Sequence, residues 1–204
     1  GGGVNISLSS AEPIISNLII KNNDALQGGG MFIGEGANPK ISNVTIKNNS
    51  STEGSAIFFV GNTNAELNNI LIVDNSGNYG AINCYSSGSN PLFINSSIVN
   101  NTGTGFYIIS GNPTLINTIV YNNSSSYESN YNAGILTANY SNIEGGYTGL
   151  SNIDVDPLFA DTANGDYSLS NFSSCIGAGL DTSIVPTTDL DGNLRPNPAG
   201  SNPD

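Results

Sequence analysis

A segment of 26 residues recurs along the chain, and this repeat constrains the fold more than any other feature. The segment PIISNLIIKNN begins at residue 13, and related segments begin at residues 39, 65, 91 and 113, with spacings of 26, 26, 26 and 22. The fifth position of each segment is always Asn, at Asn17, Asn43, Asn69, Asn95 and Asn117. Such a regular period is typical of a solenoid, in which each repeat stacks on its neighbours.

The apolar residues within each repeat identify its elements as short strands. They alternate with polar residues, and no run has the i, i+3, i+4, i+7 spacing that a helix needs. The leucine-rich-repeat solenoid is excluded because its L-x-x-L-x-L-x-x-N pattern is absent. We therefore predict an all-β fold, a right-handed parallel β-helix of about six coils with 22–26 residues per coil.

The Asn column suggests a ladder of side chains. Equivalent positions of neighbouring coils lie about 4.8 Å apart in such a fold. An inward-turned Asn at a bend can therefore bond the Asn of the next coil and the backbone of the turn. We predict this structural ladder at Asn17, Asn43, Asn69, Asn95 and Asn117. Structural use of Asn also explains why 33 of the 204 residues are Asn.

Residues 1–146, which carry the repeat, resemble the family of bacterial right-handed parallel β-helix repeat proteins. Residues 147–204 lose the period and contain the pieces DVDPLFAD, NGDYSLS, SSCIGAGL and TDLDGNLRP. These pieces resemble the segment that follows the repeats in the choice-of-anchor Q class of surface proteins, although Cys175 replaces the usual Ala and Gly177 the usual Asp. The resemblance implies an exported protein at the bacterial cell surface, whose signal and anchor lie outside this sequence. We expect the segment to cap the last coil or to pack along the β-helix.

The charge composition excludes several classes of function. Four Lys and Arg against sixteen Asp and Glu give a net charge of −12, and His is absent. A basic footprint for nucleic acid is therefore missing, as are His-based catalysis and nearly every type of zinc site. No apolar run approaches the ~20 residues of a membrane-spanning helix, so we expect no direct membrane insertion.

Enzymatic activity is an alternative because the resemblance extends to polysaccharide lyases and glycoside hydrolases. A lyase site needs clustered acids that hold Ca²⁺ and an Arg or Lys as base. The acids of the repeats are scattered among different columns, and the only arginine, Arg195, lies outside them. A hydrolase needs a close carboxylate pair on neighbouring coils, and no column supplies one. We therefore expect a non-catalytic structural or adhesive module, a rigid acidic rod whose partner is polysaccharide or a surface protein.

Aromatic residues suggest a carbohydrate-binding module as the second hypothesis. Two adjacent columns of the repeat contain Phe32, Phe58 and Cys84, and Ile33, Phe59 and Tyr85, respectively. One column must face inward and the other outward. If the first is core, Phe59 and Tyr85 form an exposed strip with Tyr107 nearby, and such rings can stack on sugars. The alternatives are that loops cover the strip or that it mediates a lateral contact.

The tail contains a candidate calcium loop, and Ca²⁺ is the one cofactor that the sequence suggests. Asp189, Asp191 and Asn193 form a D-x-D-G-N pattern, in which oxygen side chains alternate around a glycine turn. The alternative is an Asx turn without an ion, which is favoured because the Glu that completes an EF-hand loop is missing.

The two cysteines, Cys84 and Cys175, lie far apart in the sequence. Cys84 falls in an apolar column, and Cys175 replaces a small apolar residue. We predict two buried free thiols, with a disulfide as the alternative in an exported protein.

Overall fold

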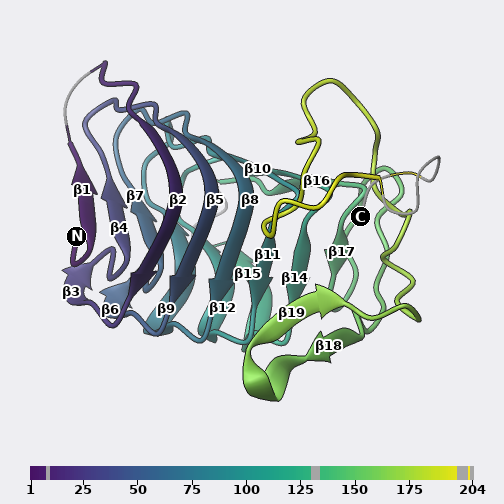
Figure 1. Cartoon of the computed structure of the whole chain (residues 1–204). Coiled ribbons are helices and arrows are strands. Elements are labelled where there is room, and N and C mark those ends of the chain that lie inside the picture. The colour runs from purple at the N-terminus through teal and green to yellow at the C-terminus, as the bar shows by residue number, and fades with distance from the viewer. Residues whose placement is uncertain (8–9, 130–133, 197–201, 203–204) are drawn as a thin grey trace.

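The chain winds into a parallel β-solenoid, as the repeat predicts. The computed structural model describes residues 1–7, 10–129, 134–196 and 202. Figure 1 shows the strands of successive coils lying side by side along one axis, with the N-terminus at one end. Each coil adds strands to two sheets, sheet A with eight strands and sheet B with nine. Sheet A has six rungs, β1-β4-β7-β9-β12-β15, which enclose about five complete turns rather than the predicted six.

The strands are short, and each sheet pairs them in parallel. Sheet A consists of β1 (Val4–Ile6), β3 (Asp24–Gln27), β4 (Met31–Ile33), β6 (Ser50–Glu53), β7 (Ile57–Phe59), β9 (Ser76–Cys84), β12 (Thr102–Ile108) and β15 (Ser125–Ser129). Sheet B consists of β2 (Ile14–Lys21), β5 (Lys40–Lys47), β8 (Glu66–Val73), β10 (Leu92–Ile94), β11 (Ser97–Val99), β13 (Thr114–Ile116), β14 (Ile119–Tyr121), β16 (Thr137–Asn139) and β17 (Asn142–Ile143). A separate antiparallel hairpin consists of β18 (Phe159–Asp161), the 3-10 helix η1 (Thr162–Asn164) and β19 (Asp166–Leu169). No helix in the described part of the chain is long and apolar enough to cross a membrane.

The apolar columns of the repeat form the core between the two sheets. Ile46 pairs with Ile20 on one side and Ile72 on the other, and all three side chains are buried. The rings of Phe59 and Phe93 meet edge to face, with their centroids 6.4 Å apart. Edge-to-face pairs of this kind add specific contacts to the burial of apolar area.

Asn is frequent because most coils use it at three positions with different demands; Asp74 replaces it once. The predicted ladder position has left-handed backbone, with φ of 57° at Asn17 and 54° at Asn43. The first residue of the following polar pair is also left-handed, with φ of 58° at Asn22 and 53° at Asn48. Asn tolerates this conformation better than most side chains do. The second residue of each pair has a different role, in the interior.

A ladder of amides runs along the interior, buried at its three central rungs and partly exposed at both ends. We call Asn23, Asn49, Asn75, Asn101 and Asn123 the inner Asn ladder. Asn75 Nδ2 donates to Asn101 Oδ1 at 3.0 Å and to Ile46 O at 2.9 Å. Asn75 Oδ1 accepts from the backbone N–H and from Nδ2 of Asn49, both at 3.0 Å. Side-chain bonds join every neighbouring pair from Asn23 to Asn123. The ladder therefore satisfies backbone groups at a bend, where the sheets leave them without a strand partner.

The predicted ladder lies on the outside of the solenoid, and we call Asn17, Asn43, Asn69, Asn95 and Asn117 the outer Asn ladder. Side-chain bonds join Asn43 to Asn17 at 3.4 Å, Asn69 to Asn43 at 2.9 Å and Asn117 to Asn95 at 3.1 Å. The predicted inward orientation is wrong. Ile41 and Val44, which flank Asn43, both enter the core, so the bend between them points outward.

The C-terminal residues first close the end of the solenoid. The Ile143 N–H donates to Ile153 O at 3.0 Å, and both amide atoms of Asn142 bond the backbone of Val155. Tyr147 covers the core end by packing edge to face on Tyr127, with centroids 5.1 Å apart. These contacts occupy the rung that would otherwise present unpaired backbone groups.

The rest of the tail runs back along the outside of sheet B (Figure 1). We call residues 180–195 the strap. Leu180 pairs with both amide atoms of Asn117, at 2.7 and 3.0 Å. Asn69 Nδ2 donates to Thr188 O at 2.8 Å, and Arg195 Nη1 donates to Asn69 Oδ1 at 2.6 Å. The strap is therefore held by the outer Asn ladder, whose bend carries its amides outward.

Candidate functional site

A one-residue slip in sheet A decides which aromatic side chains face outward. Met31 pairs with Ile57 at a separation of 26 residues, whereas Ile57 pairs with Ile82 at a separation of 25. Phe58 is therefore opposite Asn83, and Phe59 is opposite Cys84. A shift of one residue moves a strand's side chains to the opposite face. The sequence contains evidence of the slip, because AIF at residues 56–58 and AIN at residues 81–83 are 25 residues apart. An alignment of the repeats on Gly54 and Gly80, which are 26 residues apart, does not reveal it.

Phe59 lies in the core, in register with the core residue Ile33, so its predicted place in an exposed strip is wrong. Phe59 is fully buried and belongs to the same core cluster as Ile33 and Cys84. Its edge-to-face partner is Phe93. The core column therefore consists of Ile33, Phe59 and Cys84, which the sequence alignment divided between its two columns.

A different set of rings forms a row on the outer face of sheet A, and we call Phe32, Phe58, Tyr79, Tyr85 and Tyr107 the aromatic row. Phe58 stacks on Phe32 with centroids 5.6 Å apart, and Tyr85 packs on Phe58 at 5.7 Å. Tyr79 and Tyr107 form a second group at 5.0 Å. Tyr79 is 43% exposed and Tyr85 is 44% exposed, whereas Tyr107 is buried. The row thus presents two accessible phenol rings, those of Tyr79 and Tyr85, which pack on the buried rings of Tyr107 and Phe58.

Asn83 lies between the two groups of rings. It pairs with Phe58 on one side and with Tyr107 on the other, and it faces outward because its neighbours Ile82 and Cys84 enter the core. The side chain is nevertheless fully buried, and neither its Oδ1 nor its Nδ2 has a hydrogen-bond partner. Native structures rarely leave a buried amide without partners. The sequence pattern could not show this residue, because the slip hid its position.

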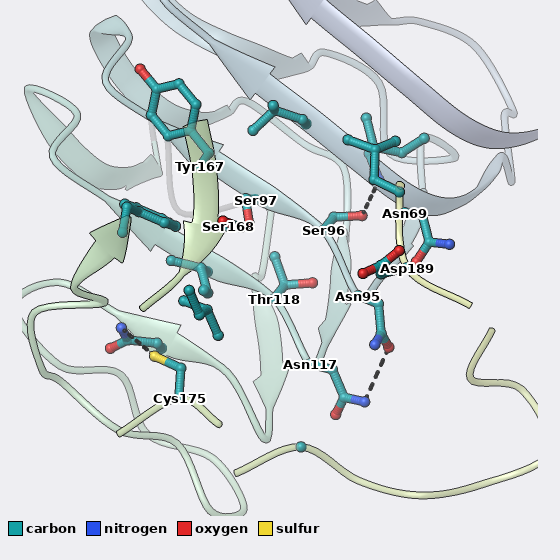
Figure 2. Close-up of a pocket in the computed structure, with 18 of the residues that line it drawn as sticks. Asn69, Asn95, Ser96, Ser97, Asn117, Thr118, Tyr167, Ser168, Cys175 and Asp189 are labelled. Carbon is teal, nitrogen blue, oxygen red and sulfur yellow. Dashed lines mark hydrogen bonds between the residues drawn. The ribbon is translucent and has the colours of Figure 1, made fainter. Parts of the chain in front are cut away.

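A groove lies between the tail and the outer face of sheet B, with a volume of about 520 Å³ (Figure 2). Its floor consists of outward side chains of three neighbouring coils, Leu71, Ser97 and Ile119. Tyr167 and Ser168 of β19 form one wall. The outer Asn ladder and the strap form the other.

Three polar side chains of the groove, Asn69, Asn117 and Tyr167, take part in contacts between the tail and the solenoid. Tyr167 is hydrogen-bonded to the side chains of Asp74 and Asn100. Burial, and after it the charge of Asp74, raises the pKa of the Tyr167 phenol. Asn69 and Asn117 bind the strap. The groove is therefore largely the seam between the tail and the solenoid.

The calcium loop is closed by its own hydrogen bonds. Asp189 Oδ1 accepts from the backbone N–H groups of Asp191 at 2.9 Å and Asn193 at 2.7 Å, and its Oδ2 accepts from Asn193 Nδ2 at 2.9 Å. This is the geometry of an Asx turn. Across the described residues, no group of three or more Asp, Glu or Cys side chains gathers as a metal site.

We predict that removal of calcium leaves the stability of the chain unchanged. Both carboxylate oxygens of Asp189 already have donors, so an ion would have to displace those bonds. The melting temperature measured by circular dichroism should be the same in EDTA and in calcium-containing buffer. If calcium raised the melting temperature by several degrees, the prediction would be wrong and the loop at Asp189, Asp191 and Asn193 would be a calcium site.

The two thiols serve packing. Cys84 and Cys175 are both buried and free, as predicted. Burial raises the pKa of the Cys84 thiol well above its usual range, which keeps the group protonated and unreactive. Asn142 Nδ2 donates to Cys175 Sγ at 3.3 Å.

Comparison with known proteins identifies the fold family. No curated protein and no solved structure matches the chain. Residues 1–156 match the family described as "Right handed beta helix region", which spans both sheets and the pairing of Ile153 with the last coil. The chain therefore belongs to the right-handed β-helix family.

Proposed function

We propose that this chain is a non-catalytic adhesive module of an exported bacterial surface protein, and that it contacts carbohydrate through the aromatic row. One observation carries the proposal: rings in contact with one another follow the outer face of a rigid sheet, and Tyr79 and Tyr85 remain accessible. Contiguous exposed aromatic side chains on a soluble fold are typical of interaction sites. Their flat faces suit the C–H faces of sugar rings.

The solenoid supplies rigidity and spacing for such a contact. Parallel pairing fixes each ring on a strand, and neighbouring coils lie about 4.8 Å apart, close to the length of one sugar unit. Little side-chain entropy is lost on binding, because Tyr has few rotatable bonds. The acidic charge of −12 favours solubility of a projecting rod and disfavours adsorption to other acidic polymers.

The aromatic row is favoured over the groove because the polar groups of the groove are engaged within the chain. Asn69, Asn117 and Tyr167 all bond other parts of the molecule. A ligand in the groove would compete with those bonds.

We predict that Tyr85→Ala weakens carbohydrate binding and leaves the fold intact. The wild-type chain should bind a subset of a broad oligosaccharide panel, and Tyr85→Ala should weaken that binding by at least about tenfold, since the loss of a stacked ring costs more than 1 kcal/mol. Phe172→Ala is the matched control, because Phe172 is an exposed ring of the tail, outside the row.

A second control separates the two surfaces. Ser97→Trp fills the floor of the groove and should leave binding unaltered. Binding that is lost in Ser97→Trp and retained in Tyr85→Ala would transfer the proposed contact to the groove. A wild-type chain that binds no member of the panel would contradict the carbohydrate proposal.

A further inference from the structure

The buried amide of Asn83 is the most unusual polar group of the chain. Its two polar atoms are inaccessible and lack hydrogen-bond partners, at the centre of the outer face of sheet A. An amide buried without partners loses its bonds to water and gains none in return. An apolar residue of similar size would avoid that loss, so the position favours Asn for a reason other than stability.

The neighbours of Asn83 indicate what could satisfy it. Tyr85, which follows Asn83 by two positions and comes directly after the end of β9, packs on Phe58, while Tyr79 packs on Tyr107. Both Phe58 and Tyr107 flank Asn83 in the register of the sheet. Each ring that flanks the amide in the sheet is therefore in contact with one of the two exposed tyrosines of the row. Exposed side chains change rotamer within nanoseconds, and such changes are common at binding surfaces.

We propose that Asn83 is the hydrogen-bonding centre of a site for uncharged sugars, reached when the exposed tyrosines move aside. The amide offers one acceptor and two donors, which match the donors and acceptors of adjacent sugar hydroxyls. Tyr85 stacks on the ring of the same sugar. This inference rests on the proposed function, and it adds the class of ligand and the residue that hydrogen-bonds to it.

The distribution of charge selects the class of sugar. The basic residues are Lys21, Lys40, Lys47 and Arg195. The three lysines belong to strands of sheet B, and Arg195 belongs to the strap. The described strands of sheet A thus contain no cation to pair with a uronate, and they contain the acids Asp24 and Glu53. A neutral hexose polymer fits this face, and an anionic one is repelled.

The test compares Asn83→Leu with the wild-type chain on neutral hexose oligosaccharides and on matched uronate oligosaccharides. The wild-type chain should bind neutral oligosaccharides only. Asn83→Leu should weaken that binding at least about tenfold, because the lost hydroxyl bonds are not replaced. Its melting temperature should be unchanged or a few degrees higher, because Leu removes the unpaired amide. Asn171→Leu, an exposed position in the tail, is the matched control and should change neither value.

The outcomes separate this inference from the proposed function. A wild-type chain that binds nothing contradicts both. Wild-type binding that persists in Asn83→Leu, together with a lower melting temperature, would overturn the inference alone and assign the amide a structural role. Asn83→Ala provides a second variant if Leu disturbs the packing of the rings, and it should lose binding in the same way.

Discussion

Asn75→Ala should destabilise the chain by about 4 kcal/mol, because several buried groups would lose their partners at once. Asn75 donates to Ile46 O, to Val73 O and to Asn101 Oδ1, and it accepts from two donors of Asn49. All of these groups lie in the interior, where water cannot replace the missing amide. Urea denaturation followed by circular dichroism measures the change in the free energy of unfolding.

Asn17→Gly is the control for this prediction. Asn17 is exposed, its ladder bond with Asn43 spans 3.4 Å, and glycine accepts the φ of 57° without strain. We expect this variant to change stability by less than about 1 kcal/mol. Equal losses in the two variants would contradict the distinction between the inner and outer Asn ladders.

Phe59→Ala should cost about 3–5 kcal/mol, the range for truncation of a buried ring. Phe59 is fully buried. Its ring packs on Phe93 with centroids 6.4 Å apart, and Phe93 packs on Phe106 with centroids 5.4 Å apart. Its removal therefore leaves a cavity beside a second ring pair. The same denaturation experiment measures the loss.

Tyr85→Ala is the comparison, since Tyr85 is 44% exposed and should lose less than half as much stability. If Phe59→Ala unfolded no more easily than Tyr85→Ala, Phe59 would belong to the surface, and the register of β7 and β9 would be wrong.

The repeat was sufficient to predict the solenoid because residues one period apart in the sequence stack on one another in neighbouring coils. Columns such as Ile20, Ile46 and Ile72 stay in register through three coils at a constant spacing of 26 residues. The outer Asn ladder was located for the same reason. Its direction was predicted wrongly, since left-handed backbone at Asn17 and Asn43 interrupts the alternation on which inward and outward assignments depend.

The aromatic row could be predicted only in part. Tyr85 is exposed as predicted, whereas Tyr107 is buried. The slip between Ile57 and Ile82 exchanges the faces of Cys84 and Tyr85 relative to Phe58 and Phe59, which the sequence alignment does not show. The loss of one residue is hard to detect in a degenerate repeat, yet it exchanges the inward-facing and outward-facing side chains of the strand.

The sequence predicts that the tail caps the last coil or packs along the β-helix, but it does not predict which surface the tail covers, because the tail has no period. Its position depends on contacts between residues far apart in the chain, such as Asn117 with Leu180 and Asn69 with Arg195. These contacts form the strap wall of the groove. Sequence patterns report local order, and they do not report which exposed surface a loop will cover.

The most direct test of the central claim is a crystal structure of the chain with the oligosaccharide that it binds best on the panel. We predict a sugar ring stacked on Tyr85, with a hydroxyl within hydrogen-bond distance of Asn83 and with the ring of Tyr85 or Tyr79 displaced. An oligosaccharide seated instead on Leu71, Ser97 and Ile119 in the groove would contradict this account and make sheet B, rather than sheet A, the contact surface of the protein.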